Sequence, residues 1–140
     1  MTKLLSATGI PETDQFFLTT LYFGSDRQPL SFLLDTGSPS TWVAAPNCKT
    51  CSQLSSRFQP ASKTLKKTNT KLKVSYDRKK WVAGYLSHDN VYLNEKNVGE
   101  DISFLYVQMA KGFKNWQADG VLGLAPRKGK KRRDPKVFIE

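Results

Sequence analysis

The sequence has few of the residues that build metal sites and membrane spans. Its 140 residues include two cysteines and one histidine, too few for a zinc site with four Cys or His ligands. No apolar run approaches the length that a helix needs to cross a bilayer. The amino-terminal residues contain only the short apolar stretch Leu4-Leu5, so no signal peptide is visible there. These absences exclude a Cys/His zinc module and an α-helical membrane protein.

Acidic residues are also scarce relative to basic ones. Twelve Asp and Glu oppose 22 Lys and Arg, which gives a formal net charge of +10. The excess lies mainly in residues 63–80 and 127–136, which contain eight and seven basic residues with one acid each. The second stretch contains Gly129 and Pro135 and predicts an exposed loop. Polyanion binding is one interpretation of this loop, but an ordinary solvated surface is favoured.

Amphipathic helical spacing is absent, and short runs rich in Phe, Tyr, Leu, Val and Thr recur instead. The expected strands are Phe16–Phe23, Ser31–Leu34, Thr41–Ala45, Leu72–Tyr76, Val82–Leu86, Asn90–Leu93, Ile102–Met109 and Val121–Leu124. Turn residues at 24–29 and 94–97 predict hairpin connections. Many short strands at this spacing predict an all-β sandwich or barrel-like fold.

One short segment carries the chemistry. In Phe32-Leu-Leu-Asp35-Thr36-Gly37-Ser38 an aspartate directly follows an apolar strand end, where a carboxylate requires hydrogen bonds. Thr36 and Ser38 offer hydroxyl groups, and Gly37 lets backbone N–H groups approach closely. Such a loop would hold Asp35 ionised or let it share a proton with a second acid. The alternative is a plain turn between two strands.

Several segments together resemble the amino-terminal lobe of pepsin-like (family A1) aspartic proteases, in order and approximate spacing. They are Phe17–Gly24, Asp35–Val43, Cys48 with Cys51, Phe58–Pro60, Lys73–Tyr76 and Asp119–Ala125. The resemblance implies an all-β, six-stranded-barrel-like lobe that is normally one of two. It divides the chain into a leader or propeptide remnant (1–14), the lobe (15–126), and a basic loop with a truncated end (127–140).

The resemblance assigns roles around the Asp-Thr-Gly motif. Asp35 takes the place of the first catalytic aspartate, which activates water together with an aspartate from the other lobe. Thr36 would brace the two active-site loops against each other, and Gly37 would allow the tight loop and supply a backbone donor. Ser38 would hydrogen-bond the Asp35 carboxylate. No metal or other cofactor is implied.

Further residues follow from the same resemblance. Tyr76 matches the flap tyrosine that closes over substrate, and Trp42 matches the tryptophan whose indole N–H orients it; plain aromatic core is the alternative for both. Asp119 belongs to a structural segment and is not a second catalytic acid. His88, the only histidine, is expected on a surface strand.

The two cysteines fall where the family has a small disulfide loop. Cys48-Lys-Thr-Cys51 could also be a redox pair, but no βαβ pattern surrounds it. A disulfide requires an oxidising compartment. Likeness to the family places the protein in the secretory pathway, in a vacuole or lysosome, or outside the cell.

The chain departs from the family at the flap and in length. Asp77-Arg-Lys-Lys-Trp81 follows the tyrosine where glycines are usual, Pro39 replaces a small residue, and Ala118 stands where an aromatic is common. Only one Asp-Thr-Gly is present, so a fragment of a two-lobed enzyme, a processed chain or a self-pairing lobe is expected, in that order.

The leading hypothesis is therefore an aspartic endopeptidase lobe that acts on polypeptide substrates with a second lobe or partner chain. The alternative is an inactive single-lobe binding protein with a basic loop for polyanions. Nucleic acid is disfavoured as a partner, and no membrane span is expected.

Overall fold

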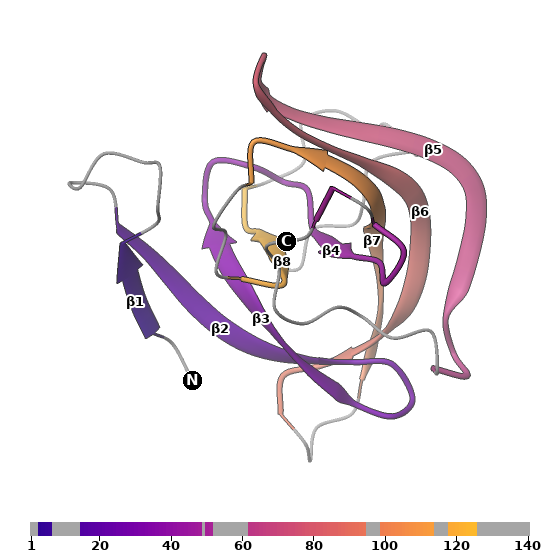
Figure 1. The fold of residues 1–140 in the computed structure, drawn as a ribbon. Coiled ribbons are helices and arrows are strands. Elements are labelled where there is room, and N and C mark those ends of the chain that lie inside the picture. Colours follow the sequence, from indigo (N-terminus) through magenta and orange to yellow (C-terminus); the bar gives the residue numbers. More distant parts are fainter. Residues whose placement is uncertain are drawn as a thin grey trace.

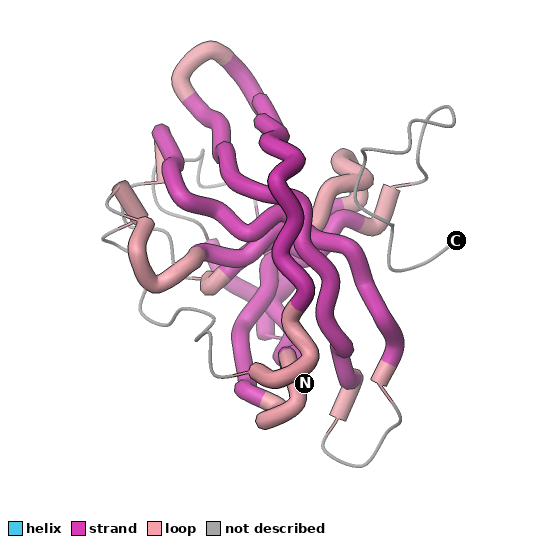
Figure 2. The backbone as a smooth tube through the Cα atoms, turned by 90° about the vertical axis from the view of Figure 1, so that its right-hand side faces the viewer, coloured by secondary structure: helices cyan, strands magenta, loops and turns pink. Residues whose placement is uncertain are grey.

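The computed structural model describes residues 3–6, 15–48, 50–51, 62–94, 99–113 and 118–125, and these form strands and turns without a helix (Figures 1 and 2). The strands are β1 (Lys3–Ser6), β2 (Gln15–Phe23), β3 (Gln28–Asp35), β4 (Trp42–Ala44), β5 (Lys66–Asp77), β6 (Lys80–Tyr92), β7 (Glu100–Lys111) and β8 (Gly120–Gly123). The all-β prediction is confirmed. The basic segment 127–140 and the Phe58-Gln-Pro60 segment lie outside the described residues.

One mixed sheet contains all of these strands, in the order β1-β2-β3-β8-β4-β7-β6-β5. An additional antiparallel pairing joins β2 to β6 through Tyr22↔Tyr92 and Phe23↔Val91. This pairing closes β2, β3, β8, β4, β7 and β6 into a ring, and leaves β1 and β5 outside it. The expected six-stranded, barrel-like lobe corresponds to this ring, and β1 and β5 lie on opposite sides of the view in Figure 1.

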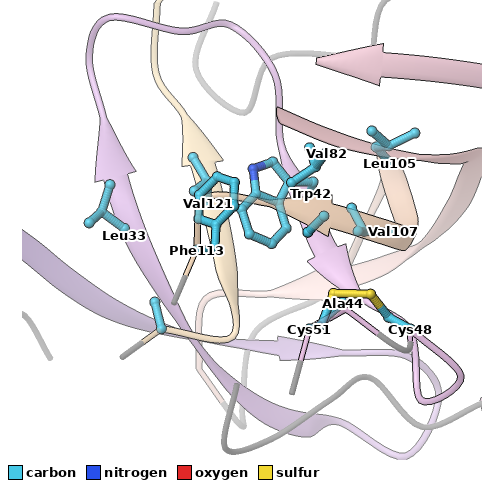
Figure 3. Close-up of a cluster of buried hydrophobic side chains, with 12 residues drawn as sticks. Leu33, Trp42, Ala44, Cys48, Cys51, Val82, Leu105, Val107, Phe113 and Val121 are labelled. Atoms are coloured by element: carbon cyan, nitrogen blue, oxygen red, sulfur yellow. A yellow bond between two sulfur atoms is a disulfide. The ribbon is translucent and has the colours of Figure 1, made fainter. Parts of the chain in front are cut away.

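Alternating side chains on the ring strands form two apolar clusters. The ring cluster takes residues from all six ring strands: Leu21, Phe23, Leu30, Phe32, Val43, Ala45, Val91, Ile102, Phe104, Tyr106 and Leu122. The flap-side cluster takes the alternate residues of the same strands, including Leu33, Trp42, Val82, Leu105, Val107 and Val121 (Figure 3). Leu72, Val74 and Tyr76 of β5 pack against it. Two-sided burial explains why β4 and β8 are apolar throughout.

Strand β8 occupies the centre of the sheet although it comes last in the described chain. It runs parallel to β3, from Phe32↔Gly120 to Asp35↔Gly123, and antiparallel to β4. Gly120 makes this insertion possible, because a Cβ there would lie against the Trp42 carbonyl oxygen and 2.9 Å from the Phe32 ring. The parallel pairing carries the chain past the end of β3, where Asp35 lies.

The hairpin elements differ from the prediction in extent. The two short runs expected at 82–86 and 90–93 are one continuous strand, β6, and β5 begins at Lys66 rather than Leu72. The Ser87, His88 and Asp89 positions looked like a break because they are polar. Ser87 and Asp89 are nonetheless buried, and Asp89 accepts hydrogen bonds from Ser62 Oγ at 2.8 Å and Thr64 Oγ1 at 2.6 Å. Satisfied polar groups therefore replace apolar ones in the middle of this strand.

Two connections and the amino-terminal segment were also predicted from the sequence. The connection expected at 24–29 is a turn over residues 24–27, with positive φ at Gly24 (83°) and Arg27 (53°), and residues 28 and 29 already belong to β3. The 94–97 connection lies largely outside the described residues. Residues 3–6, within the segment interpreted as a leader or propeptide remnant, form β1 and pair with β2. That interpretation stays a prediction.

Candidate active site

Asp35 ends β3 at the start of a tight, solvent-facing loop. The Gly37 N–H donates to Asp35 Oδ1 at 2.9 Å, so the loop backbone holds one carboxylate oxygen. Asp35 is half-buried, whereas Thr36 and Gly37 are exposed. Ser38 is buried, and its Oγ accepts a hydrogen bond from the Ser40 N–H at 3.2 Å. The predicted roles of Thr36 as a brace and of Ser38 as a donor to Asp35 stay predictions.

Strand β8 and the residues after it hold this loop through hydrogen bonds donated by backbone N–H groups. The Leu124 N–H donates to the Asp35 carbonyl oxygen at 2.8 Å, and the Ala125 N–H donates to the Ser38 carbonyl oxygen at 3.1 Å. The Gly123 N–H donates to the buried Thr41 Oγ1 at 3.1 Å. Each of these donors lies in β8 or directly after it, more than 80 positions from the loop in the sequence. The position of the Asp35 loop therefore depends on the insertion of β8.

Asp119 precedes β8 and binds β3 rather than facing the Asp35 loop. Its Oδ2 accepts hydrogen bonds from the Ser31 N–H at 2.8 Å and from Ser31 Oγ at 3.2 Å, and its own N–H donates to the Ser31 carbonyl oxygen at 2.7 Å. Asp119 is only 4% exposed. These contacts fit the structural role expected from the sequence, since the carboxylate anchors one segment to another.

The flap is the hairpin of β5 and β6, and Tyr76 lies near its end. The Trp42 Nε1–H donates to Tyr76 Oη at 2.9 Å. Burial raises the pKa of Tyr76 from 10.0 to about 12; the Trp42 and Ser38 hydrogen bonds oppose this shift, and the negative charge of Asp35 adds to it. The phenol therefore lies within electrostatic reach of the Asp35 carboxylate. Tyr76 is thus bonded to Trp42 and affected by the charge of Asp35.

The flap tip is short and cationic. Asp77 pairs with Lys80 across a two-residue turn of Arg78 and Lys79, and Asp77 Oδ1 accepts the Lys79 N–H at 2.7 Å. The register shifts between Ser75↔Trp81 and Asp77↔Lys80, which leaves Tyr76 as the extra residue on β5. The Asp77 carboxylate thus stabilises a turn that contains no glycine by accepting from a backbone N–H two residues on.

Two further predictions concern residues away from the Asp35 loop. Cys48 and Cys51 form a disulfide with a Cα–Cα distance of 5.4 Å, which confirms the disulfide interpretation over a free redox pair. Both cysteines are buried beside Ala44 in the flap-side cluster (Figure 3). His88 lies on β6 as expected, but it is half-buried, with Nδ1 2.9 Å from Ser103 Oγ.

Two residues that support the site were not predicted. Phe113 packs edge-on against Trp42, with ring centroids 5.2 Å apart, and against Tyr76 at 6.0 Å, so it completes an aromatic group beneath the flap. Thr41 holds β8 through its hydroxyl. Phe113 stands alone between polar residues and gives no periodic signal, whereas Thr41, next to Trp42, could have been proposed from the motif.

Comparisons with known proteins agree with this geometry. The eukaryotic aspartyl protease family model matches residues 16–138. Plasmepsin IV of Plasmodium falciparum (isolate 3D7) is 34% identical over 107 residues, which is 72% of this chain and 23% of that protein. The aspartic-type endopeptidase ctsD of Aspergillus fumigatus is 32% identical over 117 residues, or 79% of this chain and 23% of that protein. The vacuolar aspartic protease of Candida albicans is 28% identical over 112 residues, or 78% and 26%.

The chain therefore belongs to the eukaryotic aspartyl protease family, and its fold is that of a single pepsin-like lobe. It spans about a quarter of the length of these curated relatives. In the part of the chain that the structure describes, there is no helix of the length and apolarity needed to cross a membrane.

Proposed function

We propose that this chain supplies the amino-terminal half of an aspartic endopeptidase active site, with Asp35 as its catalytic carboxylate. The observation that carries the proposal is the arrangement of this group: Asp35 Oδ1 accepts the Gly37 N–H, while the charge of Asp35 reaches the flap residue Tyr76. A half-buried carboxylate held by a backbone donor, within electrostatic reach of a hydrogen-bonded tyrosine, is suited to hold a water molecule and a peptide between loop and flap.

The chemistry requires a second carboxylate from another lobe or chain. Two carboxylates about 3 Å apart do not both ionise readily, so they share one proton, as in pepsin. The ionised carboxylate takes a proton from water while the water oxygen attacks the peptide carbonyl carbon, and the protonated carboxylate donates to the carbonyl oxygen. Thr36 would contact the loop of the partner lobe, which agrees with its exposure.

The cationic flap tip gives this active site a preference among substrates. Arg78 and Lys79 are exposed at the turn that would close over a peptide. Their charges favour glutamate or aspartate at the substrate positions beneath the tip. Replacement of both residues by serine should abolish a preference for acidic over neutral peptides in the active enzyme; an unchanged preference would contradict this assignment.

The proposal is tested by supplying the second carboxylate from a separate lobe. The chain is combined with a carboxy-terminal lobe that carries its own Asp-(Thr/Ser)-Gly, and cleavage of a fluorogenic peptide is followed at acidic pH. Cleavage is expected only with both lobes present, and loss to background is expected in Asp35→Asn. Activity that survives in Asp35→Asn would overturn the proposal. Activity of this chain alone, second order in its concentration, would overturn the requirement for a different partner.

The proposed location is the secretory pathway, including a vacuole. The buried Cys48–Cys51 disulfide needs an oxidising compartment, and one relative is named a vacuolar aspartic protease. Fractionation of the source cells with alkylation of free thiols tests this location. A cytosolic protein with both thiols reduced would refute it.

A further inference from the structure

The outer face of the flap hairpin carries a feature that the proposed reaction does not use. Three cross-strand rows lie on this face: Lys71–Tyr85–Tyr106, Lys73–Ala83–Met109 and Ser75–Trp81–Lys111. Tyr106, at the inner end of the first row, is buried in the ring cluster. The neighbouring row Val74–Val82–Ala110 points the other way, into the flap-side cluster. The outer rows therefore lie on the opposite side of the hairpin from Trp42, and their three lysines are accompanied by no carboxylate.

The centre of this face is hollowed for a local structural reason. Ala83 has a small side chain, and the register of β6 with β7 shifts next to it, between Ala83↔Met109 and Gly84↔Val107. The resulting hollow has a volume of about 370 Å³ and is lined by residues that include Ala83, Tyr85 and Met109. Met109 is 52% exposed, so an apolar side chain stands in solvent at the rim. The hollow is thus apolar at its floor and cationic at its edge.

The lysines are placed over aromatic rings. Lys73 Nζ lies 4.5 Å from the centroid of the Trp81 ring, and Lys71 Nζ lies 5.8 Å from the centroid of Tyr85. Cation–π contacts of this kind orient the ammonium groups beside the hollow. Lys71 and Lys73 are alternate residues of one strand, so their side chains emerge about 7 Å apart, which is also the spacing of alternate residues in an extended peptide.

We propose that this face is a docking site for an extended acidic polypeptide segment that places one aliphatic side chain in the hollow and flanking carboxylates on the lysines. Charge complementarity selects the acidic partner, and the apolar floor selects a side chain to fill it. Single-stranded nucleic acid fits less well, because its bases need open aromatic faces for stacking. Here Lys71 and Lys73 cover the faces of Tyr85 and Trp81.

Met109 provides a direct probe of binding. The chain has only two methionines, so a sample labelled with ¹³C at the methionine methyl groups gives signals for Met109 and Met1 alone. Titration with the synthetic peptide Glu-Ser-Leu-Ser-Glu, blocked at both ends, should shift the Met109 signal in a saturable way and leave Met1 unchanged. Absence of a saturable shift at low ionic strength would overturn the proposal.

Charge reversal at two pairs of lysines distinguishes binding at this face from nonspecific attraction to a basic protein. Lys71→Glu/Lys73→Glu should weaken peptide binding about fivefold or more, since two partly exposed ion pairs are lost and repulsion is added. Lys63→Glu/Lys66→Glu makes the same change in net charge at exposed lysines elsewhere, and it should alter the affinity less than about twofold. Equal weakening by the two variants would show nonspecific attraction and contradict the proposal.

Two further measurements test the occupant. Ala83→Leu fills the hollow without a change in charge, and it should abolish the Met109 shift while the variant retains a wild-type thermal transition. Unimpaired peptide binding by this variant would show that the hollow takes no part in binding. Oligothymidylate should bind more weakly than the peptide at equal ionic strength; tighter binding of the oligonucleotide at Met109 would identify a nucleic-acid surface instead.

Discussion

Trp42 Nε1 donates a hydrogen bond to Tyr76 Oη across 2.9 Å, and this contact joins the short central strand β4 to the flap. Trp42 is fully buried at 0% exposure, whereas Tyr76 is half-buried and its pKa is affected by the charge of Asp35. This polar contact lies within an aromatic group that includes Phe113 and links the Tyr76 end of the flap to the core. Flap position and core packing are coupled through this pair.

A double-mutant cycle should measure that coupling. Tyr76→Phe leaves the buried indole N–H without its acceptor and should lower the free energy of unfolding by about 1–2 kcal/mol. Trp42→Phe also leaves a cavity, and it should cost about 2–4 kcal/mol. Chemical denaturation of both single variants and the double variant should give a coupling energy near 1 kcal/mol. A coupling energy near zero would contradict the link, and Tyr85→Phe on the same hairpin is the control.

Stability should fall between pH 10 and pH 12. The pKa of Tyr76 is about 12 in the folded protein, against 10.0 ordinarily, so in this interval the folded state keeps a proton that the unfolded state has lost. Because the folded state binds one more proton than the unfolded state in this interval, a rising pH lowers the free energy of unfolding. The contribution of Tyr76, about 1–2 kcal/mol, is lost by pH 12.

Tyrosinate absorbance and urea denaturation along this pH range can follow the loss. Tyr76→Phe should have a shallower pH dependence than the wild type, although burial also raises the pKa of Tyr106 to about 12 and leaves a residual slope. Identical profiles for the variant and the wild type would show that Tyr76 titrates normally.

Asp119→Ala should be strongly destabilising. The substitution removes the acceptor of the Ser31 N–H and Oγ, which lie at 2.8 and 3.2 Å, and it releases the segment that leads into β8. We expect a loss of about 2–4 kcal/mol in the free energy of unfolding. Asp101→Ala, at an exposed position of β7, is the matched control and should stay within about 0.5 kcal/mol of the wild type. Similar losses for both variants would refute an anchoring role.

Gly123→Ala should displace the Asp35 loop. A Cβ at Gly123 would lie 2.6 Å from backbone atoms of Pro39 and Ser40, so one segment must move. At Gly37 the nearest atom to an added Cβ is Asp35 Oδ1 at 3.4 Å, an ordinary contact. Thermal denaturation should show a loss above about 2 kcal/mol for Gly123→Ala and less than about 1 kcal/mol for Gly37→Ala. The reverse order would contradict the packing of β8 against the loop.

Local pattern predicted most of the strands, except β1 and the full extent of β5 and β6, and it placed Asp35 at the end of a strand. The family resemblance predicted the contact between Trp42 and Tyr76. Other features depend on register and could not be predicted. Ser87 and Asp89 interrupt the apolar pattern of β6 because their partners, Ser62 and Thr64, come from a distant segment. The lysine-rimmed face follows from register shifts in β5 and β7, and a one-residue change in register would move each lysine to the other face.

The central position of β8 also sets the order in which the lobe can assemble. The hydrogen bonds that hold it join residues far apart in the sequence, such as Asp119 and Ser31, which are 88 positions apart. Until β8 arrives, β3 and β4 present unpaired edges to solvent, because each is joined to the other only through that strand. Contacts of such long sequence separation form slowly. During synthesis the Asp35 loop would therefore acquire its geometry last, when nearly the whole described chain has left the ribosome.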